Sequence, residues 1–359
     1  MSTMIKNNRP AADRGSVLPS LTNRWLKVND SETGYRNVET GSAFQGAAIH
    51  DSSDSEKQSS DAVQTARGIS EALDMQNAAS ANFFENRMLH EGDCPEVHFE
   101  LSQGEPILID RQAYSLPPGH HAQLLIHAHG EDAQYRNGRI FLHIAEDAQL
   151  DLMIVNHLGE RAVNNLSVSL SMEDGASLHI SDVEMGNGKS NLHIAGSLQG
   201  VDSEVYISTA YLAGKDAVLD LFYDLKLKGA LSHATIDANG ALLDRAYKSF
   251  RGTLDFLEGA YGAVADEQEF TILMSDDAHS VAVPLLLCHE DHVVGNHAAS
   301  AGRLDEEMLF YLMSRGISRK EAEGLIVESR MIPTLDRIRN DGLRSELLQE
   351  IHETIVRSE

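Results

Sequence analysis

The sequence predicts a mainly β protein with helical regions on both sides of the strands. Between residues 96 and 296 roughly ten segments alternate apolar with polar residues, and Gly, Asp and Asn residues separate them. Helical spacing of apolar residues occurs only before this stretch, over 61–95, and after it, over 297–359. Many short strands without intervening helices fit a β-sandwich, a barrel or a parallel β-solenoid.

A recurring unit favours the solenoid among these three folds. EDAQLDLMIV (146–155), EDGASLHISDV (173–183) and GKDAVLDLFYDL (214–225) each join an acidic turn, a small residue and an alternating strand. The stacked coils of a solenoid repeat one such unit and bury its inward residues in a common core. The spacing between the units is irregular, so the repeat by itself leaves the other two folds open.

The first 60 residues are predicted to form a largely flexible arm. They are rich in Ser, Asn, Asp and Gly and end in DSSDSEKQSSD, a composition that buries too little apolar surface to offset the entropy of ordering. Within the arm, residues 18–30 hold the only tryptophan, Trp25, and are expected to dock on a folded surface. The helical region that follows has Asp61 as its candidate N-cap, and Gly92 ends the helical pattern.

The C-terminal region is predicted to contain three short helices. Asp305 fits the N-cap of the first helix, and Gly316 fits the position just beyond its end. A capping box, Ser318 with Glu321, opens a second helix over 319–330.

Pro333 suits the first turn of the third helix. The apolar stripe of this helix comprises Leu343, Leu347, Leu348, Ile351 and Ile355. Helices at the end of a β-stack are typical of a docking module. The first helix has more apolar residues than one packed face needs, so some are expected to bind a partner. These candidate partner-binding residues are Leu309, Phe310, Leu312 and Met313.

Composition and charge narrow the class of protein. The 359 residues include 55 acidic and 29 basic side chains, and a formal net charge of −26 repels nucleic acid and anionic membranes. Only Cys94 and Cys288 occur, whereas an oxidised secreted scaffold would use more cysteines. The N-terminus lacks the apolar core of a signal peptide, and no apolar run is long enough to span a bilayer. We therefore expect a cytoplasmic protein that binds neither nucleic acid nor membranes.

Familiar catalytic motifs are missing from the sequence. GNGKS (186–190) resembles a phosphate-binding loop, but Val183 stands where that motif requires glycine, and strands rather than a strand and a helix flank it. It is interpreted as a turn, so any ATP must be used by another subunit. There is no nucleophile elbow, C-x-x-C pair or H-E-x-x-H motif. Carboxylates on the strands leave a two-carboxylate glycosidase site possible, but solvated acids on the outer face of an acidic β protein are much the commoner explanation.

The stretch CHEDHVVGNH (288–297) is the candidate site. A strand over 284–294 would place three kinds of metal ligand on one face: Cys288, Glu290 and His292. Gly295 and Asn296 would then break the strand, and His297 would begin the turn into the helices. A thiolate, a carboxylate and an imidazole suit iron or zinc. The alternative is that Cys288 is a small buried hydrophobe and that the acids and histidines face water.

A longer sequence pattern, which begins at Gly295, favours a functional site at CHEDHVVGNH over a buried Cys288. GNHAASAGRLDEEMLFYLMSRGISRKEAEGLIVES (295–329) resembles the C-terminal signature of the SufB/SufD family of iron–sulfur cluster assembly scaffold proteins. That signature reads S-H-G-A-T, a spacer, D-E-x-x-L-F-Y-L-x-S-R-G-I, then E-A-x-x-L-I-V. FRGTLDFLEGAYGAVADEQEFTIL (250–273) resembles the last coils of the family, and LPSLTNRWLKVND (18–30) resembles the N-terminal segment of SufD-type members. The sequence is therefore closer to the SufD type.

The resemblance implies a right-handed parallel β-helix flanked by N- and C-terminal α-helical regions. It also implies a dimer, either of a SufB-type with a SufD-type subunit or of two copies of one chain. SufC-type ATPases would bind the C-terminal helices, and ATP hydrolysis in them would drive a rearrangement of the dimer interface, where a nascent cluster is built. The chain itself is then a non-catalytic scaffold that holds an iron–sulfur cluster only transiently, with no cofactor tightly bound at rest.

The resemblance also assigns residues. His297 matches the histidine that SufD-type chains supply at the interface, whereas Gly295 and Ala278 stand where other members have cysteines. Cys288 resembles a cysteine of shorter members, so His297 and Cys288 are the expected metal ligands, and Glu290 joins them if the strand register allows. Two alternatives stay open. One is a self-sufficient SufB-like homodimer that uses Cys288 and His297 of both chains, and the other is a β-solenoid carbohydrate-active enzyme.

Overall fold

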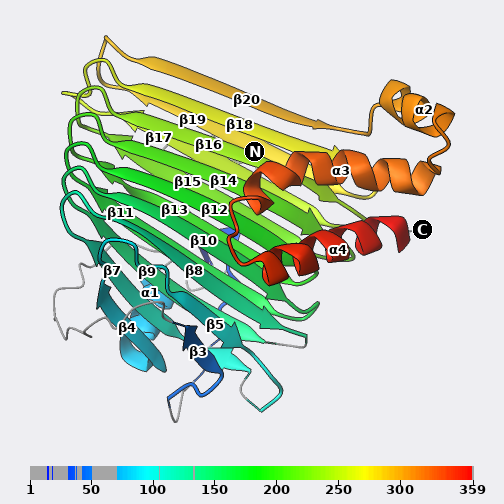
Figure 1. Ribbon diagram of the computed structural model, residues 1–359, viewed down its shortest axis with the longest axis horizontal. Coiled ribbons are helices and arrows are strands. Elements are labelled where there is room, and N and C mark those ends of the chain that lie inside the picture. The colour runs from blue at the N-terminus through cyan, green and yellow to red at the C-terminus, as the bar shows by residue number, and fades with distance from the viewer. Residues whose placement is uncertain are drawn as a thin grey trace, which may run out of the picture.

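The computed structural model describes residues 14–15, 18, 31–36, 38, 43–50, 71–104, 106–131 and 134–357. These residues form a parallel β-solenoid with helices towards both ends of the chain (Figure 1), so the predicted fold class is confirmed. Strands alternate along the chain between two facing sheets. From β7 (Asp110–Leu116) to β18 (Val264–Leu273), each strand therefore pairs with the strand two places later in sequence order, and each coil gives one strand to each sheet.

The first sheet contains nine strands, and all of its pairings are parallel except that of β3 with β5. Its strands in spatial order are β20 (Val294–Gly302), β18 (Val264–Leu273), β16 (His233–Leu242), β14 (Glu204–Ala213), β12 (Ser177–Gly186), β10 (Gln149–Leu158), β8 (His121–Gly130), β5 (Glu96–Glu100) and β3 (Ala47–His50).

The second sheet faces the first across the core. Its strands in spatial order are β19 (His279–Cys288), β17 (Tyr247–Phe256), β15 (Val218–Leu227), β13 (Lys189–Leu198), β11 (Val163–Met172), β9 (Tyr135–Ile144), β7 (Asp110–Leu116) and β4 (Phe83–Met88), with β6 (Ile107–Leu108) beside β9. A separate pair joins β1 (Arg14–Gly15) to β2 (Ser31–Glu32). The helices are α1 (Glu71–Ser80), α2 (Glu306–Ser314), α3 (Arg319–Leu335) and α4 (Asp341–Arg357).

The acidic turns of the recurring unit reverse the chain between coils. Asp147 and Gly175 have positive φ angles of 55° and 64° at equivalent places in two of these turns. The residue that follows each of them, Ala148 or Ala176, donates its N–H to the carbonyl three residues earlier and is buried. A left-handed residue followed by a small buried one therefore explains why the unit recurs. GNGKS also forms a turn, because Asn187 and Gly188 connect β12 directly to β13.

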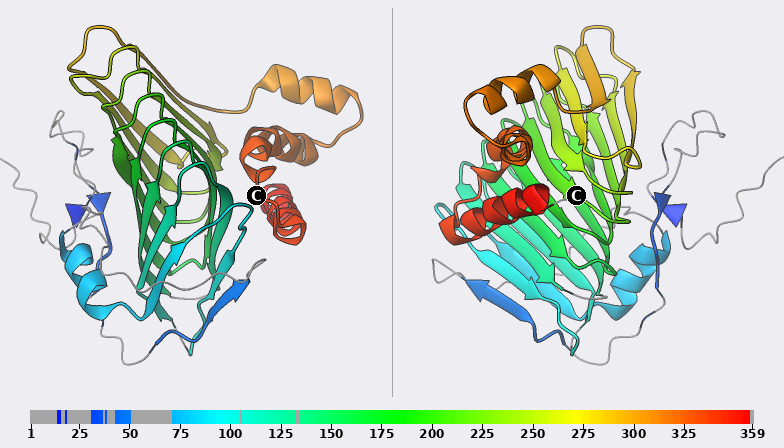
Figure 2. Two further views of the ribbon diagram at one scale, coloured as in Figure 1. Left: turned by 60° about the vertical axis from the view of Figure 1, so that its left-hand side comes forward. Right: turned by 90° about the vertical axis from the view of Figure 1, so that its right-hand side faces the viewer.

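Helices α3 and α4 cover the outer face of the first sheet (Figures 1 and 2). Their buried residues, among them Val327, Met331 and Ile351, pack with Val155 and Leu212 of the sheet in a second apolar core. Helix α1 lies on the opposite side, where Leu73 packs with Tyr135 and Val163 of the second sheet. No helix in the described ranges is both long enough and apolar enough to cross a membrane.

The predicted caps of the C-terminal helices are confirmed. The Asp305 side chain accepts hydrogen bonds from the N–H groups of Glu307 and Met308 at the start of α2. Ser318 and Glu321 form the reciprocal capping box of α3. Gly316 has φ +89°, as expected beyond a helix end. In α4 the residues Leu343, Leu347, Ile351 and Ile355 of the predicted stripe are buried, and Leu348 packs beside them.

The prediction for Pro333 is wrong. This residue lies inside α3, which continues to Leu335, and the third helix begins only at Asp341. A proline within a helix lacks the N–H that the carbonyl of Ser329 would accept. The helix persists because residues on both sides of the proline, Met331 and Leu335, are fully buried in the second core.

The N-terminal expectation is confirmed only in part. Residues 71–80 are helical, but Phe83–Met88, also expected to be helical, form strand β4. This strand buries the polar residues Glu85 and Arg87 and exposes the apolar Phe84. A search for alternating apolar residues therefore could not recognise it as a strand. Residues 61–70 and Trp25 lie outside the described residues. Within the N-terminal arm, Phe44 is buried against Phe99. The flexibility of the rest of the arm stays a prediction.

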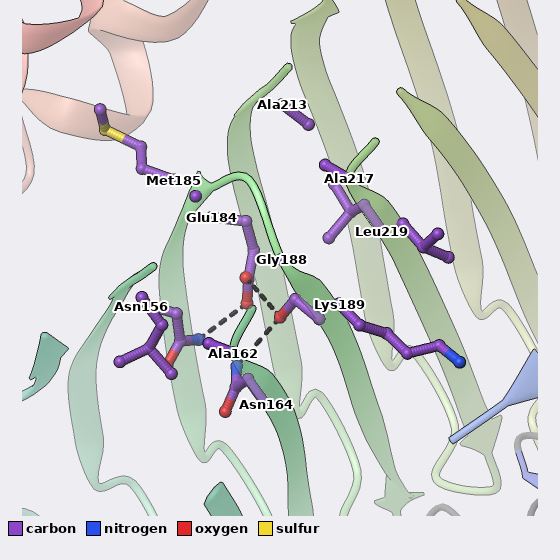
Figure 3. A pocket seen from close by; sticks show the side chains of 14 residues that line it. Asn156, Ala162, Asn164, Glu184, Met185, Gly188, Lys189, Ala213, Ala217 and Leu219 are labelled. Carbon is purple, nitrogen blue, oxygen red and sulfur yellow. Dashed lines mark hydrogen bonds between the residues drawn. The ribbon is translucent and has the colours of Figure 1, made fainter. Parts of the chain in front are cut away.

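Polar side chains form a connected chain inside the solenoid. Figure 3 shows part of it: Asn156 and Ser190 donate to the two carboxylate oxygens of Glu184 at 2.7 and 2.8 Å, and Asn164 donates to Ser190 at 3.0 Å. These residues border a cavity of about 30 Å³, which is enough for a water molecule. Arg136 extends the chain from Asn156 to Asp110, with hydrogen bonds of 2.9 to 3.1 Å. Polar groups buried this deeply are tolerated because they satisfy one another.

We predict that Pro333→Ala raises the free energy of unfolding by about 1–3 kcal/mol, since alanine restores the missing helix hydrogen bond. Urea denaturation of both proteins measures the difference. The matched control is Ile332→Ala, at the neighbouring exposed position, which keeps the backbone N–H and should change stability by less than about 0.5 kcal/mol. Equal or lower stability of the Pro333 variant would show that α3 is shaped to fit the proline.

A second prediction concerns Glu267, which is 1% exposed on β18. Burial, with Glu269 nearby, raises its pKa from an ordinary 4.5 to about 8. The folded protein therefore keeps a proton that the unfolded chain loses, so this contribution to stability is complete below pH 4.5 and declines as the pH rises towards 8. The expected slope in this window is about −1.4 kcal/mol per pH unit.

Denaturation of the wild type and Glu267→Gln at pH 5, 6.5 and 8 tests the prediction. The difference in stability should shift in favour of the variant as the pH rises, because glutamine has no proton to lose. Glu258→Gln, at an exposed position in a nearby turn, controls for a general loss of negative charge. A pH-independent difference between Glu267→Gln and the wild type would contradict the assignment.

Candidate functional site

The candidate site lies at the last coil, where the solenoid ends. Strands β19 and β20 are the terminal strands of the two sheets, and no described strand pairs with their outer edges. Most of β17, one coil earlier, is buried, whereas β19 is mostly half-buried and nearly all of β20 is exposed. An open sheet edge presents unpaired N–H and C=O groups to which another chain can add strands.

His297 points along the core side of this last coil. It pairs in register with Glu267 of β18, which continues a column of fully buried residues from the coils below: Leu124, Leu152, Ile180, Ile207 and Ile236. Residues of one column point the same way. His297 is nevertheless exposed, because no further coil covers it.

The prediction that Gly295 and Asn296 break the strand before His297 is wrong. All three residues lie within β20, which runs to Gly302, beyond the expected start of the helical region at 297. Gly295 serves packing here, since a Cβ at this position would lie 3.1 Å from the ring of Phe256. Asn296 holds the register by donating to Asp266 of β18 at 2.8 Å.

Cys288 is the last residue of β19 and belongs to an inward column of the second sheet. The column below it is apolar and buried: Leu116, Ile144, Met172, Leu198, Leu227 and Phe256. The cysteine itself is a free thiol and exposed, so the interpretation as a buried hydrophobe is wrong for this chain. The same open end that exposes His297 exposes Cys288.

Glu290 and His292 do not share a strand face with Cys288, because β19 ends at Cys288 and the turn to β20 follows. Glu290 accepts hydrogen bonds in this turn from the N–H groups of Gly259 at 3.3 Å and Asp291 at 3.0 Å. The bond from Gly259 is the main cause that lowers the pKa of Glu290. The described residues contain no group of three or more His, Cys, Asp or Glu side chains placed to hold a metal ion.

Sequence reasoning missed the buried acids beneath His297. The carboxylate oxygens of Glu267 have no hydrogen-bond partner, and a Cβ at Gly252 would collide with one of them, so this glycine makes room for the acid. Glu269, two residues on, pairs with Lys248 and Thr271. The signal was present in VADEQEFTIL, where Glu267 and Glu269 occupy alternate positions, but their polar neighbours Asp266 and Gln268 concealed which face is inward.

The candidate partner surface on α2 divides into buried and exposed residues. Leu309 is fully buried in the second core and Leu312 packs against that core, so the expectation that Leu309 contacts a partner is wrong. Phe310 is 74% exposed and Met313 is 42% exposed. Two residues that the prediction omitted, Met308 and Tyr311, are exposed as well. Figure 2 shows that α2 stands apart from the sheets, beside the end of β20.

Comparison with known proteins agrees with this architecture. Residues 99–330 match the family described as SUF system FeS cluster assembly, SufBD core domain. The iron-sulfur cluster assembly protein SufD of Bacillus subtilis is 35% identical over 127 residues, which are 35% of this chain and 29% of that protein. SufD of Escherichia coli is 22% identical over 257 residues, 71% of this chain and 57% of that protein.

An iron-sulfur cluster assembly SufBD family protein of Pyrococcus horikoshii is 27% identical over 199 residues, 55% of this chain and 44% of that protein. The matched part thus spans less than two thirds of each of these relatives. The family match covers more than half of the present chain and includes the coils that carry Cys288 and His297. The chain therefore belongs to the SufBD family of the SUF iron–sulfur cluster assembly system and is similar to its SufD members.

Proposed function

We propose that this chain is a non-catalytic scaffold subunit of the SUF complex, and that its last coil forms the dimer interface at which a nascent iron–sulfur cluster is built. The observation that carries the proposal is the open end of the solenoid, where an imidazole and a thiol lie in inward columns without a covering coil. Family membership supports the connection with cluster assembly.

A second β-solenoid is the partner that suits this end. The outer edges of β19 and β20 offer two sets of backbone groups on facing sheets, so two strands of another chain could add to both. The half-buried Val283 and Leu285 to Leu287 of β19 would lose contact with water in the process. We propose a SufB-type subunit as the partner, and the alternative is a second copy of this chain.

The cluster is the cargo of the scaffold, and this chain would supply two kinds of ligand to it. A neutral imidazole at His297 and a thiolate at Cys288 both bind iron. The two residues lie on different sheets of one coil, and no third ligand joins them within the described residues. A partner chain would therefore complete the coordination, and release would follow when the interface opens.

The energy for this opening would come from a partner. The GNGKS segment forms a strand-to-strand turn, and we propose that a SufC-type ATPase docks on the exposed apolar face of α2. Residues 303–305 alone separate α2 from β20, so a displacement of the helix would act directly on the strand that carries His297. SufBD family membership favours this scaffold over a carbohydrate-active enzyme.

We predict that His297→Ala abolishes cluster assembly in cells while complex formation is retained, because the side chain is exposed and carries no packing role in the isolated chain. Cluster-dependent enzyme activity and copurification of the subunits are the two measurements. Loss with His297→Ala and not with Cys288→Ser fits a SufD-type role beside SufB. Loss with both variants fits the self-sufficient homodimer.

The matched control is His289→Ala, an exposed histidine in the adjacent turn, which should assemble clusters normally. Full activity of both the His297 and the Cys288 variants would refute the interface site. Copurification identifies the partner separately: a SufB-type subunit or a second tagged copy of this chain.

We predict that Phe310→Ser and Met313→Glu each weaken binding of the ATPase by at least about tenfold, as expected if both side chains are central apolar contacts, whose loss costs more than about 1 kcal/mol. Both side chains are exposed, so the variants should fold normally. Pull-down and titration of the purified ATPase measure the effect. Met75→Glu, which changes another exposed methionine, on α1, is the control and should bind as the wild type does. Unchanged binding by both α2 variants would exclude this face.

A further inference from the structure

A row of four histidines lies on the outer face of the first sheet, beneath α4. Strand register pairs His98 of β5 with His127 of β8, and His129 of β8 with His157 of β10. His127 and His129 are two residues apart on one strand, so both point outward, and their ring centroids are 4.9 Å apart. Four imidazoles are thus immediate neighbours, an arrangement that would be unfavourable if all were protonated.

The row faces a cavity of about 680 Å³ between the sheet and α4. Four carboxylates also line this cavity: Glu131, Glu160, Glu346 and Glu350. No lysine or arginine is among the described residues that line it, although Lys215 forms an ion pair with Glu160 from outside the lining. The surroundings therefore favour a bound cation over an anion.

Two of the imidazoles already have the separation of metal ligands. The Nδ1 atoms of His98 and His127 are 3.2 Å apart. Two nitrogens bound to one tetrahedral zinc ion at 2.0–2.1 Å stand about 3.3 Å apart. A metal ion could therefore replace the present hydrogen bond between the rings with little movement of either side chain.

The ring nitrogen of His98 that points away from His127 contacts a carboxylate, as is common for metal-binding histidines. This Nε2 atom lies 3.0 Å from Oε2 of Glu96, and Asn340, just before α4, donates to the same oxygen at 3.0 Å. A carboxylate on the distal ring nitrogen fixes the orientation and raises the basicity of a ligating histidine. The neighbouring ring would bind the ion through Nδ1, because Nε2 of His127 is the distal nitrogen and is buried without a hydrogen-bond partner among the described residues.

We propose that this cavity binds one divalent transition-metal ion of borderline softness, such as Zn²⁺, Co²⁺, Ni²⁺ or Fe²⁺. His98 and His127 are the primary ligands. Since no three ligands stand ready among the described side chains, His129 rotates in as the third, and water completes the coordination. His157 stays paired with Glu350 of α4 at 3.0 Å and is therefore not counted among the ligands.

The proposed site is independent of the cluster interface. Six strand spacings separate β8 from β20 in the first sheet, which amounts to roughly 30 Å. Neither Cys288 nor His297 lies near the cavity lining. The two sites can therefore be tested separately.

Titration of the full chain with Zn²⁺ and Co²⁺, after chelation and dialysis, tests the proposal. We expect saturable binding of one ion per chain, and a Co²⁺ absorption spectrum characteristic of coordinated nitrogen ligands. His98→Gln and His127→Gln should each weaken binding at least tenfold. Glu96→Gln should weaken it about 10–100-fold, as expected of a residue that orients a ligand.

His233→Gln, an exposed histidine of β16 in the same sheet, is the matched control and should bind normally. The double variant His297→Ala/Cys288→Ser should also bind normally, which separates this site from the cluster interface. Histidine ring ¹⁵N shifts of the wild type upon Zn²⁺ addition avoid any dependence on variant folding. Absence of saturable binding, ring nitrogens that do not shift, or equal affinity in the His98 and His127 variants would overturn the proposal and leave a simple imidazole–imidazole hydrogen bond.

Discussion

Strict register between successive coils is the constraint on which the rest of this structure depends. Each strand pairs in parallel with the strands of the coils before and after it, so residues of equivalent position stack in columns. A slip of one residue would turn every inward side chain outward, and the apolar core of that coil would be lost at once. Because this pairing repeats, the strands of each coil form hydrogen bonds with those of the next. Only at the last coil do the outer edges of β19 and β20 lack a paired strand among the described residues.

The polar interior shows how demanding this register is. Asp110, Arg136, Asn156 and Glu184 belong to successive coils, and each satisfies its neighbour only in the observed alignment. Removal of one partner would leave a charge buried and uncompensated, which is far more costly than loss of an apolar contact. At the open end, Glu267 is buried without a hydrogen-bond partner among the described residues, and His297, which follows it in the same column, is exposed.

The helices give the two ends of the first sheet different surroundings. Residues of helix α4 line one side of the cavity that the histidine row of β5, β8 and β10 faces, together with carboxylates. Helix α2 stands beside β20, joined to it by three residues, and leaves the strand exposed. The chain thus places the exposed apolar face of α2 next to β20, the strand that has an open edge and carries the exposed His297. This arrangement would let events at the helix reach the interface through the backbone alone.

The sequence by itself determined the alternating strands of 96–296, the acidic turns and the helix starts at Asp305 and Ser318, because each depends on the preferences of neighbouring residues. Its motifs also singled out His297. The tertiary structure decided that Phe83–Met88 is a strand with Glu85 and Arg87 inward, and that α3 continues through Pro333. It also decided that Gly295 packs within β20 and that His297 stands over a buried Glu267. Local patterns could not show these features, since whether a polar or helix-breaking residue is tolerated at a position depends on partners that distant coils and helices supply.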